Sequence, residues 1–76
     1  MKDFVEYLIK NLVSQPDAVL ISQKEDEKGT LIEISVAAED IGKVLGRKGR
    51  MIRSIRTLIG TIGARLGLKV HVVVLQ

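Results

Sequence analysis

The chain has 76 residues, of which 46% are apolar, with no cysteine and a formal net charge of +3 at pH 7. This length fits one small domain, which buries only about 60% of its unfolded surface. The lack of cysteine excludes disulfides and thiolate metal sites. Apolar runs such as residues 72–75 are far shorter than the roughly 20 residues that cross a membrane. No signal peptide is visible, and these features predict a cytoplasmic protein without membrane insertion.

Charge is divided unevenly along the chain. Residues 1–40 hold four basic and nine acidic side chains, a net charge of −5. Residues 41–76 hold eight basic side chains and no acidic ones, a net charge of +8. This asymmetry favours a polyanion, above all nucleic acid, as the partner of the basic half. The plainer interpretation is a solvated surface whose charges mix once the chain folds.

The first half of the chain predicts a helix and a hairpin. Residues 3–14 have the periodicity of an amphipathic helix, with Asp3 as its cap and Phe4 in the core. Residues 18–25 and 30–36 have the pattern of strands, and the acidic turn between them ends in glycine. The two strands are therefore predicted to form an antiparallel hairpin.

The second half predicts two helices and a strand. Residues 37–45 form a short helix whose acidic residues Glu39 and Asp40 complement its positive end. Residues 50–66 form a longer helix that ends at Gly67, and residues 69–75 form a β-branched last strand. The longer helix has one apolar stripe, predicted to be buried: Ile52, Ile55, Leu58, Ile59, Ile62 and Leu66.

The order of these elements predicts an α+β fold. A connection that contains helices joins the second and third strands, which makes them parallel if they are neighbours. The predicted architecture is α-β-β-α-α-β in a single domain over residues 1–76, with a three-stranded mixed sheet and helices packed on one face.

Between the last two helices lies a basic glycine loop, Gly46-Arg47-Lys48-Gly49. The glycines permit a sharp turn and a close approach of a ligand to the main chain. Arg50 and Arg53 follow on the next helix, whose free N–H groups and positive dipole end point toward the same place. The stretch predicts a grip on consecutive phosphates of a nucleic-acid backbone.

The flanks of this loop carry a family resemblance. The nine residues from Val44 to Ile52 resemble the KH-domain signature Val-Ile-Gly-x-x-Gly-x-x-Ile, with Leu45 in place of isoleucine. A second Gly-x-x-Gly, at residues 60–63, falls inside a predicted helix and lacks these flanks. The order of elements is similar to the type II KH arrangement, and residues 37–50 resemble the small single-KH RNA-binding proteins of bacteria (KhpA type).

The resemblance implies an RNA-binding protein rather than an enzyme. Its loop would clamp about four nucleotides of single-stranded RNA or DNA, beside an aliphatic groove that includes part of the second strand. It also implies an RNA chaperone or post-transcriptional regulator, a homodimer or a heterodimer with a larger KH-containing protein, and a link to cell shape and envelope growth. No cofactor or metal is expected. The predicted RNA-binding residues are Ile41, Lys43, Val44, Leu45, Gly46, Arg47, Lys48, Gly49, Arg50, Ile52 and Arg53.

Three other functions compete with this interpretation. Catalysis lacks support, because there is one histidine, no Ser-His-acid set and no nucleotide-binding loop. A membrane-surface helix at residues 50–66 would have no aromatic anchor. The third, a protein-interaction module, is described below.

The chain has only two aromatic rings, Phe4 and Tyr7. This scarcity argues against nucleic-acid-binding folds that stack bases on aromatic side chains.

A protein-interaction module is the principal alternative. Small residues at helical spacing could let another chain approach the longer helix closely, or could pack against this protein's own sheet. The residues of this stripe are Arg56, Gly60, Gly63 and Gly67.

Overall fold

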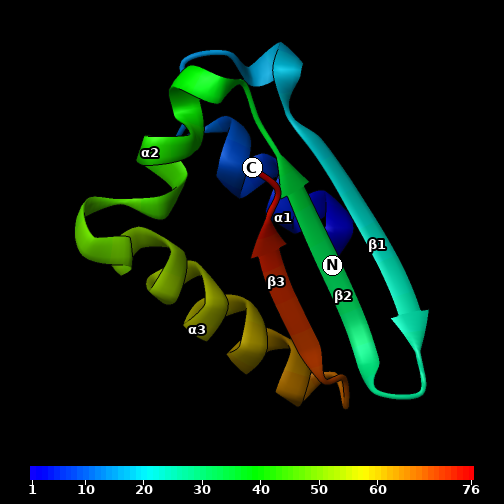
Figure 1. The fold of residues 1–76 in the computed structure, drawn as a ribbon. Helices are drawn as coiled ribbons and strands as arrows, with labels where there is room; N and C mark the ends of the chain where they lie inside the picture. Colours follow the sequence, from blue (N-terminus) through cyan, green and yellow to red (C-terminus); the bar gives the residue numbers. More distant parts are fainter.

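Three α-helices and three strands follow one another in the order α-β-β-α-α-β (Figure 1). The computed structural model describes all residues from 1 to 76. The elements are α1 (Lys2–Lys10), β1 (Leu20–Asp26), β2 (Gly29–Ser35), α2 (Ile41–Leu45), α3 (Arg50–Arg65) and β3 (Val70–Val74). Short 3-10 turns lie at Pro16–Ala18, Ala38–Asp40 and Arg47–Gly49. The predicted α+β order is confirmed.

The sheet is mixed, with the strand order β1-β2-β3. β1 and β2 form an antiparallel hairpin in which Asp26 pairs with Gly29, so only two residues make the turn. β2 and β3 are parallel, and Thr30 pairs with Val70. Both pairings agree with the prediction, because a hairpin turn reverses the chain whereas the α2–α3 crossover returns it in the same direction.

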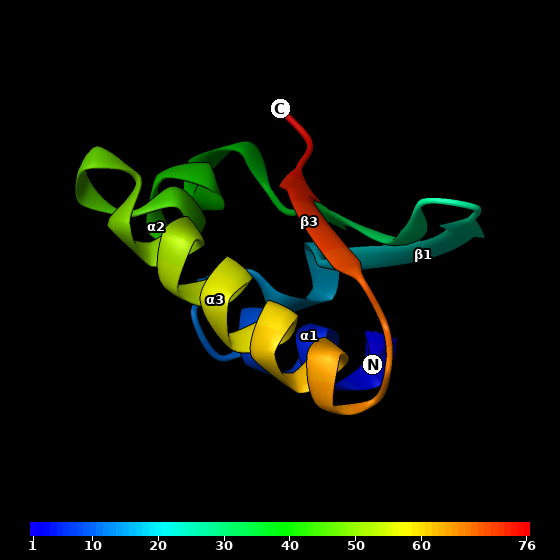
Figure 2. The ribbon, with the colours of Figure 1, turned by 90° about the horizontal axis from the view of Figure 1, so that it is seen from below.

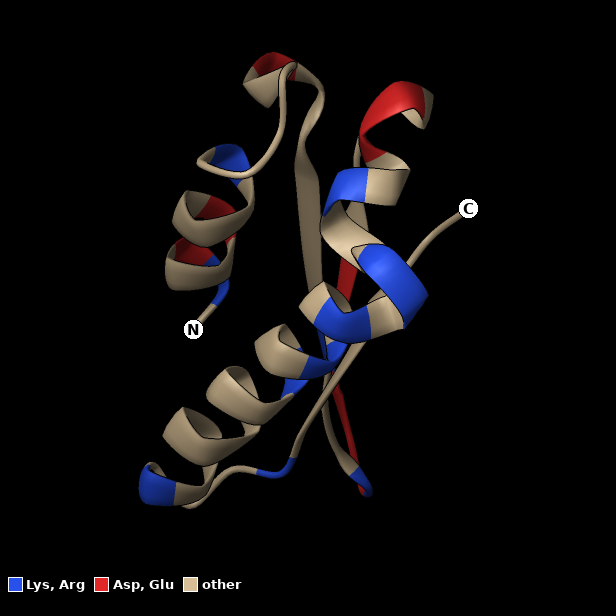
Figure 3. Cartoon of the chain, turned by 90° about the vertical axis from the view of Figure 1, so that its left-hand side faces the viewer, with Lys and Arg blue, Asp and Glu red and all other residues tan.

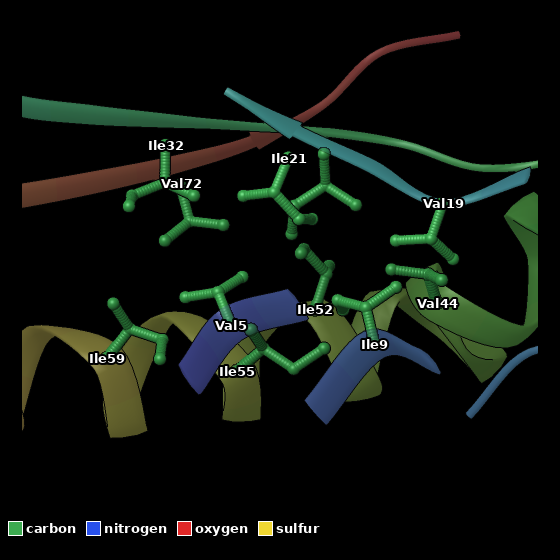
Figure 4. Close-up of a cluster of buried hydrophobic side chains, with 11 residues drawn as sticks. Val5, Ile9, Val19, Ile21, Ile32, Val44, Ile52, Ile55, Ile59 and Val72 are labelled. Carbon is green, nitrogen blue, oxygen red and sulfur yellow. The ribbon is translucent and has the colours of Figure 1, made fainter. Parts of the chain in front are cut away.

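All three helices cover one face of the sheet (Figure 2). Side chains from the sheet point down onto those of α1, α2 and α3 (Figure 4). Alternation places Ile32 and Ile34 of β2 inside, and each has no exposed surface. The core comprises Val5, Ile9, Val19, Ile21, Ile32, Ile34, Val44, Ile52, Ile55, Ile59 and Val72. None of the helices is both long enough and apolar enough to span a bilayer.

The first helix differs from its prediction in length and in its buried residues. It ends at Lys10, and the Asn11 side chain donates a hydrogen bond to the Tyr7 carbonyl at 2.7 Å. Phe4 is 41% exposed, so its assignment to the core was wrong. The buried seam of this short helix is only Val5 and Ile9, one turn apart, and Phe4 lies beside it. Met1 stands at the N-cap position, and no side chain, Asp3 included, forms a capping hydrogen bond there.

The long helix also buries fewer residues than its periodicity predicts. Leu58 is 42% exposed and Leu66 is 63% exposed, because the sheet covers only the side that carries Ile52, Ile55, Ile59 and Gly63. The end of the helix agrees with the prediction. Gly67 has a φ of +75°, and a Schellman motif closes around it through hydrogen bonds from Leu68 N–H to Gly63 C=O and from Gly67 N–H to Ala64 C=O.

Candidate nucleic-acid interface

The loop between α2 and α3 turns through three positive φ angles. Gly46 has φ 76° and ψ 174°, Lys48 has φ 56°, and Gly49 has φ 74°. Lys48 is the only non-glycine residue of the chain with a positive φ, a conformation that β-carbons disfavour by about 1 to 2 kcal/mol. This left-handed turn exposes both Arg47 and Lys48.

Gly46 packs tightly against the start of α3. A β-carbon at this position would lie 2.6 Å from the Met51 β-carbon and 2.7 Å from its backbone nitrogen. Only glycine therefore allows α2 to pass so close to α3. Gly49 is less confined, since its nearest neighbour would be the Arg53 guanidinium at 3.7 Å. The same distance places the Arg53 side chain over the loop.

Basic residues gather on this loop and on the first turn of α3 (Figure 3). Arg47, Lys48, Arg50 and Arg53 are all exposed. None of the three ion pairs of the molecule includes them, because the acidic partners belong to Lys10, Lys24 and Lys43. Four cations without a carboxylate partner, at the positive end of a 16-residue helix, form a strongly anion-attracting surface.

The predicted aliphatic residues divide into exposed and buried members. Ile41 and Leu45 are half-buried and border the solvent. Val44 is fully buried and Ile52 is 5% exposed, so both lie in the core. No hollow of the surface is lined by these four side chains. A contact between bases and Ile41 or Leu45 stays a prediction, and Val44 and Ile52 support that surface from below.

The strand beside α3 is β3. Part of the second strand, β2, was predicted to line the groove, and that assignment stays a prediction. β2 is the central strand, with a neighbour on each side. The hydrogen bonds from Thr30 N–H to Lys69 C=O and from Leu75 N–H to Ile34 C=O show which groups of β3 face β2. By alternation, Val70, Val72 and Val74 direct their backbone groups to the free edge.

Arg56 forms a hydrogen bond with one backbone group of this free edge. Its Nε donates a hydrogen bond to the Val72 carbonyl at 3.0 Å. The bond ties the middle of α3 to the middle of β3, so the two elements hold a fixed separation. No sequence pattern predicts this contact, because it depends on the strand order.

A hollow of about 630 Å³ opens on the outer side of α3. Arg50 and Arg53 of the predicted site line its end nearest the loop. The rest of its wall is Ser54, Thr57, Leu58 and Thr61. The hydroxyl groups of Ser54 and Thr61 donate to the carbonyls one turn earlier, Arg50 and Thr57. The hollow is therefore a polar helix face with cations at one end.

The stripe of small residues on α3 does not act as one surface. A β-carbon at Gly63 would lie 2.6 Å from Val70 Cγ2, so this glycine packs against the protein's own sheet. Gly60 has no neighbour within 4 Å of such an atom, and Gly67 serves the helix end. Together with the Arg56 bond to β3, these contacts support intramolecular packing as the function of the stripe.

Asp40 is a buried carboxylate that the sequence prediction placed only at a helix end. Its side chain accepts hydrogen bonds from Ser14 N–H at 3.0 Å, Ser14 Oγ at 2.7 Å and Gln15 N–H at 3.0 Å. Lys43 Nζ lies 3.5 Å away. The backbone N–H of Ser14 is the main cause that holds the pKa of Asp40 below its ordinary value of 3.8, against the opposing effect of burial.

The fold and the loop together define a KH domain of type II. A helix, a glycine-containing turn and a second helix lie against a mixed sheet, and the turn carries the Gly-x-x-Gly sequence. KH domains are binding modules and not enzymes.

The comparisons give a family within this class. Residues 2–74 match the family described as "KhpA/KhpB, KH domain", and the chain belongs to that family. It is similar to the RNA-binding protein KhpA of Chlamydia caviae, with 41% identity over 76 residues, all of this chain and 97% of the relative. It is 38% identical to KhpA of Borreliella burgdorferi, over 97% of this chain and 90% of that protein. KhpA of Aquifex aeolicus is 38% identical over all of this chain and 96% of its own length.

Proposed function

We propose that this protein binds single-stranded RNA and grips its backbone with the loop Gly46–Gly49 and the first turn of α3. The observation that carries the proposal is the set of four exposed cations without acidic partners around a left-handed glycine turn. Phosphates in a row match such a surface, because each cation neutralises one charge and each free N–H donates to an oxygen. The relatives named RNA-binding protein KhpA support the same polymer as partner.

The site favours grip over base recognition. Its cations contact phosphates, which carry no sequence information. The groups that remain for bases are the half-buried Ile41 and Leu45 and the free backbone groups of β3. Broad binding of this kind fits an RNA chaperone or post-transcriptional regulator in the cytoplasm, and single-stranded DNA would share the same backbone contacts. The link to cell shape stays an implication of the family resemblance.

A charge reversal in the loop tests the grip. In R47D/K48D both side chains are exposed, so the fold stays intact, and repulsion of phosphate reduces affinity for a short single-stranded RNA by about 100-fold or more at low salt. Fluorescence anisotropy measures this affinity, and circular dichroism checks the fold. The affinity of the unmodified protein falls steeply as salt rises, because counterions are released on binding.

The matched control is R65D/K69D, which makes the same change in net charge at the opposite end of α3. Both residues are exposed and form no ion pair. A much smaller loss of RNA affinity in this variant would show that the loss in R47D/K48D comes from the loop and not from the change in net charge. A folded R47D/K48D protein that binds as tightly as the unmodified one, or a flat salt profile, contradicts the proposal.

We also propose that α3 contributes to self-association, or to pairing with another KH domain, as the family description of KhpA with KhpB suggests. Arg56 and Gly63 of the stripe contact the protein's own strand β3, so the surface that we assign to this contact is the other side of the helix. Met51, Leu58 and Leu66 are 36%, 42% and 63% exposed there and follow helical spacing. Exposed apolar side chains on one helix face are typical of protein contact sites.

A further inference from the structure

The buried carboxylate of Asp40 joins two segments that are distant in sequence. Ser14 and Gln15 lie in the connection from α1 to β1, and Asp40 directly precedes α2. Three hydrogen bonds from these two residues end on one carboxylate whose side chain has no exposed surface. The neighbouring side chains of Gln15 and Glu39 form a second, exposed contact between the same segments.

The element that follows Asp40 is short and needs an external anchor. α2 has five residues, little more than one turn, and a helix of this length is not stable alone. Its far end continues directly into the loop, where Gly46 N–H donates to Gly42 C=O at 2.8 Å. Packing of Val44 in the core and Gly46 against Met51 holds that end. The near end is held by the hydrogen bonds of Asp40.

The position of the cations therefore depends on the near end of α2 as well as on α3. If the Asp40 contacts are lost, α2 can pivot about Val44, and the Gly46–Gly49 turn loses one of its two supports. Lys43, which Asp40 pairs at 3.5 Å, loses its orientation at the same time. The carboxylate is also fully satisfied, since no buried polar side-chain atom of the molecule is without a partner.

We propose that Asp40 is a positioning residue that fixes α2, and with it the Gly46–Gly49 loop, in the geometry that holds RNA. It does not touch the polymer, and its charge opposes the approach of phosphate. The inference rests on the proposed function only for its effect on RNA affinity, because the order of the loop can be measured without RNA.

Electrostatics and positioning predict opposite effects for one substitution. D40N removes a negative charge near the site, which by itself strengthens binding to a polyanion. It also places an amide NH₂ group among donors, so one of the N–H groups of Ser14 and Gln15 loses its acceptor. If the loop then holds its binding geometry one-tenth of the time, the apparent Kd for a short single-stranded RNA rises about tenfold.

The matched control is D17N, the same chemical change in the same α1–β1 connection. Asp17 is exposed and has no hydrogen bond or ion pair in the structure. D17N is expected to bind RNA as well as the unmodified protein or slightly more tightly. A second variant, S14A, removes only the Oγ hydrogen bond and keeps both backbone donors, so it yields a folded protein with a smaller effect in the same direction should D40N fail to fold.

Amide hydrogen exchange on the full chain without RNA gives the independent measurement. The Gly46 and Gly49 amides, bonded to Gly42 and Gly46 carbonyls, exchange at least tenfold faster in D40N, while the amides of Ile32 and Ile34 in the central strand keep their protection. Unchanged exchange at the loop in a folded D40N protein overturns the inference, as does RNA binding equal to or tighter than that of D17N. A loosened loop in a protein that never binds RNA supports the positioning role and overturns the proposed function.

Discussion

At the residue scale, Asp40 shows how one buried polar group differs from the exposed charges of the same sequence. The acidic residues of the hairpin turn are exposed. Asp40 replaces the water it loses with three donors from a distant segment, so the charged form persists in the interior. Burial of a charge is tolerated here because both carboxylate oxygens accept hydrogen bonds.

The lowered pKa of Asp40 predicts a loss of stability in acid. Its folded pKa lies below the unfolded value near 3.8. The ionised carboxylate therefore stabilises the fold fully above that value, and the contribution is lost as pH falls through the folded pKa. Urea unfolding of the unmodified protein and of D40N measures the difference in stability at each pH, which is largest near neutrality and shrinks below about pH 4.

D17N again serves as the reference for this measurement. Asp17 has no hydrogen-bond or ion-pair partner in the structure. The plot of stability against pH for D17N is therefore expected to run parallel to that of the unmodified protein. A difference between D40N and the unmodified protein that stays constant down to the lowest pH would show that the Asp40 charge contributes nothing.

At the element scale, α3 has two glycines only one turn apart that act in opposite ways. Both lie inside the helix, where glycine costs about 1 kcal/mol relative to alanine. At Gly60 a β-carbon would meet nothing within 4 Å, whereas at Gly63 it would lie 2.6 Å from Val70 Cγ2. The effect of a β-carbon on stability therefore depends on helix propensity at Gly60 and on packing against β3 at Gly63.

Alanine at these two positions is predicted to change stability with opposite signs. G60A stabilises the protein by about 0.5 to 1 kcal/mol, since it reduces the entropy of the unfolded chain without a clash. G63A destabilises it by about 1 to 3 kcal/mol, because Val70 or the helix must move. Denaturant unfolding of the two variants measures both effects. Equal and favourable shifts would mean that α3 and β3 are packed more loosely than the structure shows.

The elements that sequence predicted well are those whose pattern is local. The residues of the turn predicted the hairpin, and a run of β-branched residues predicted β3. Gly67 predicted the end of α3. Burial of Phe4, Leu58 and Leu66 was wrong, because periodicity identifies an apolar side of a helix but not how far the sheet extends over it.

The candidate site likewise has a local part that sequence predicts and long-range contacts that it does not. Its glycines and cations lie next to one another in sequence, so the motif predicted the loop. The contacts of Asp40 with Ser14 and of Arg56 with Val72 span 26 and 16 residues, and only the folded chain brings these groups together. Sequence therefore located the candidate loop but not the residues that hold it in place.

At the scale of the whole molecule, basic and acidic residues are concentrated in different places. Basic residues are densest at the loop and the start of α3, whereas the acidic residues lie on α1, in the α1–β1 connection, near the start of α2 and on the hairpin (Figure 3). A KH domain contacts only about four nucleotides, so one copy of the proposed site would bind weakly. Two copies joined through α3 would place two grips on one strand and raise the effective concentration of the second.

This arrangement makes a testable prediction with L58E. Leu58 is 42% exposed on the outer side of α3, so glutamate there leaves the core intact but opposes an apolar contact between two copies. Sedimentation equilibrium at high micromolar concentration is expected to give a dimer for the unmodified protein and a monomer for L58E. Affinity for an RNA long enough for two grips falls about tenfold or more in L58E, whereas affinity for an RNA that fits one grip changes little, because only the first gains from linkage.

L20E provides the matched control for the same experiment. Leu20 is the more exposed residue, at 69%, but it lies on β1, away from α3. It is expected to leave both the mass and the long-RNA affinity unchanged. Dissociation by L20E and not by L58E would move the contact to the sheet. A monomeric mass for the unmodified protein would instead refute self-association, and the grip would then act alone or beside a different KH domain.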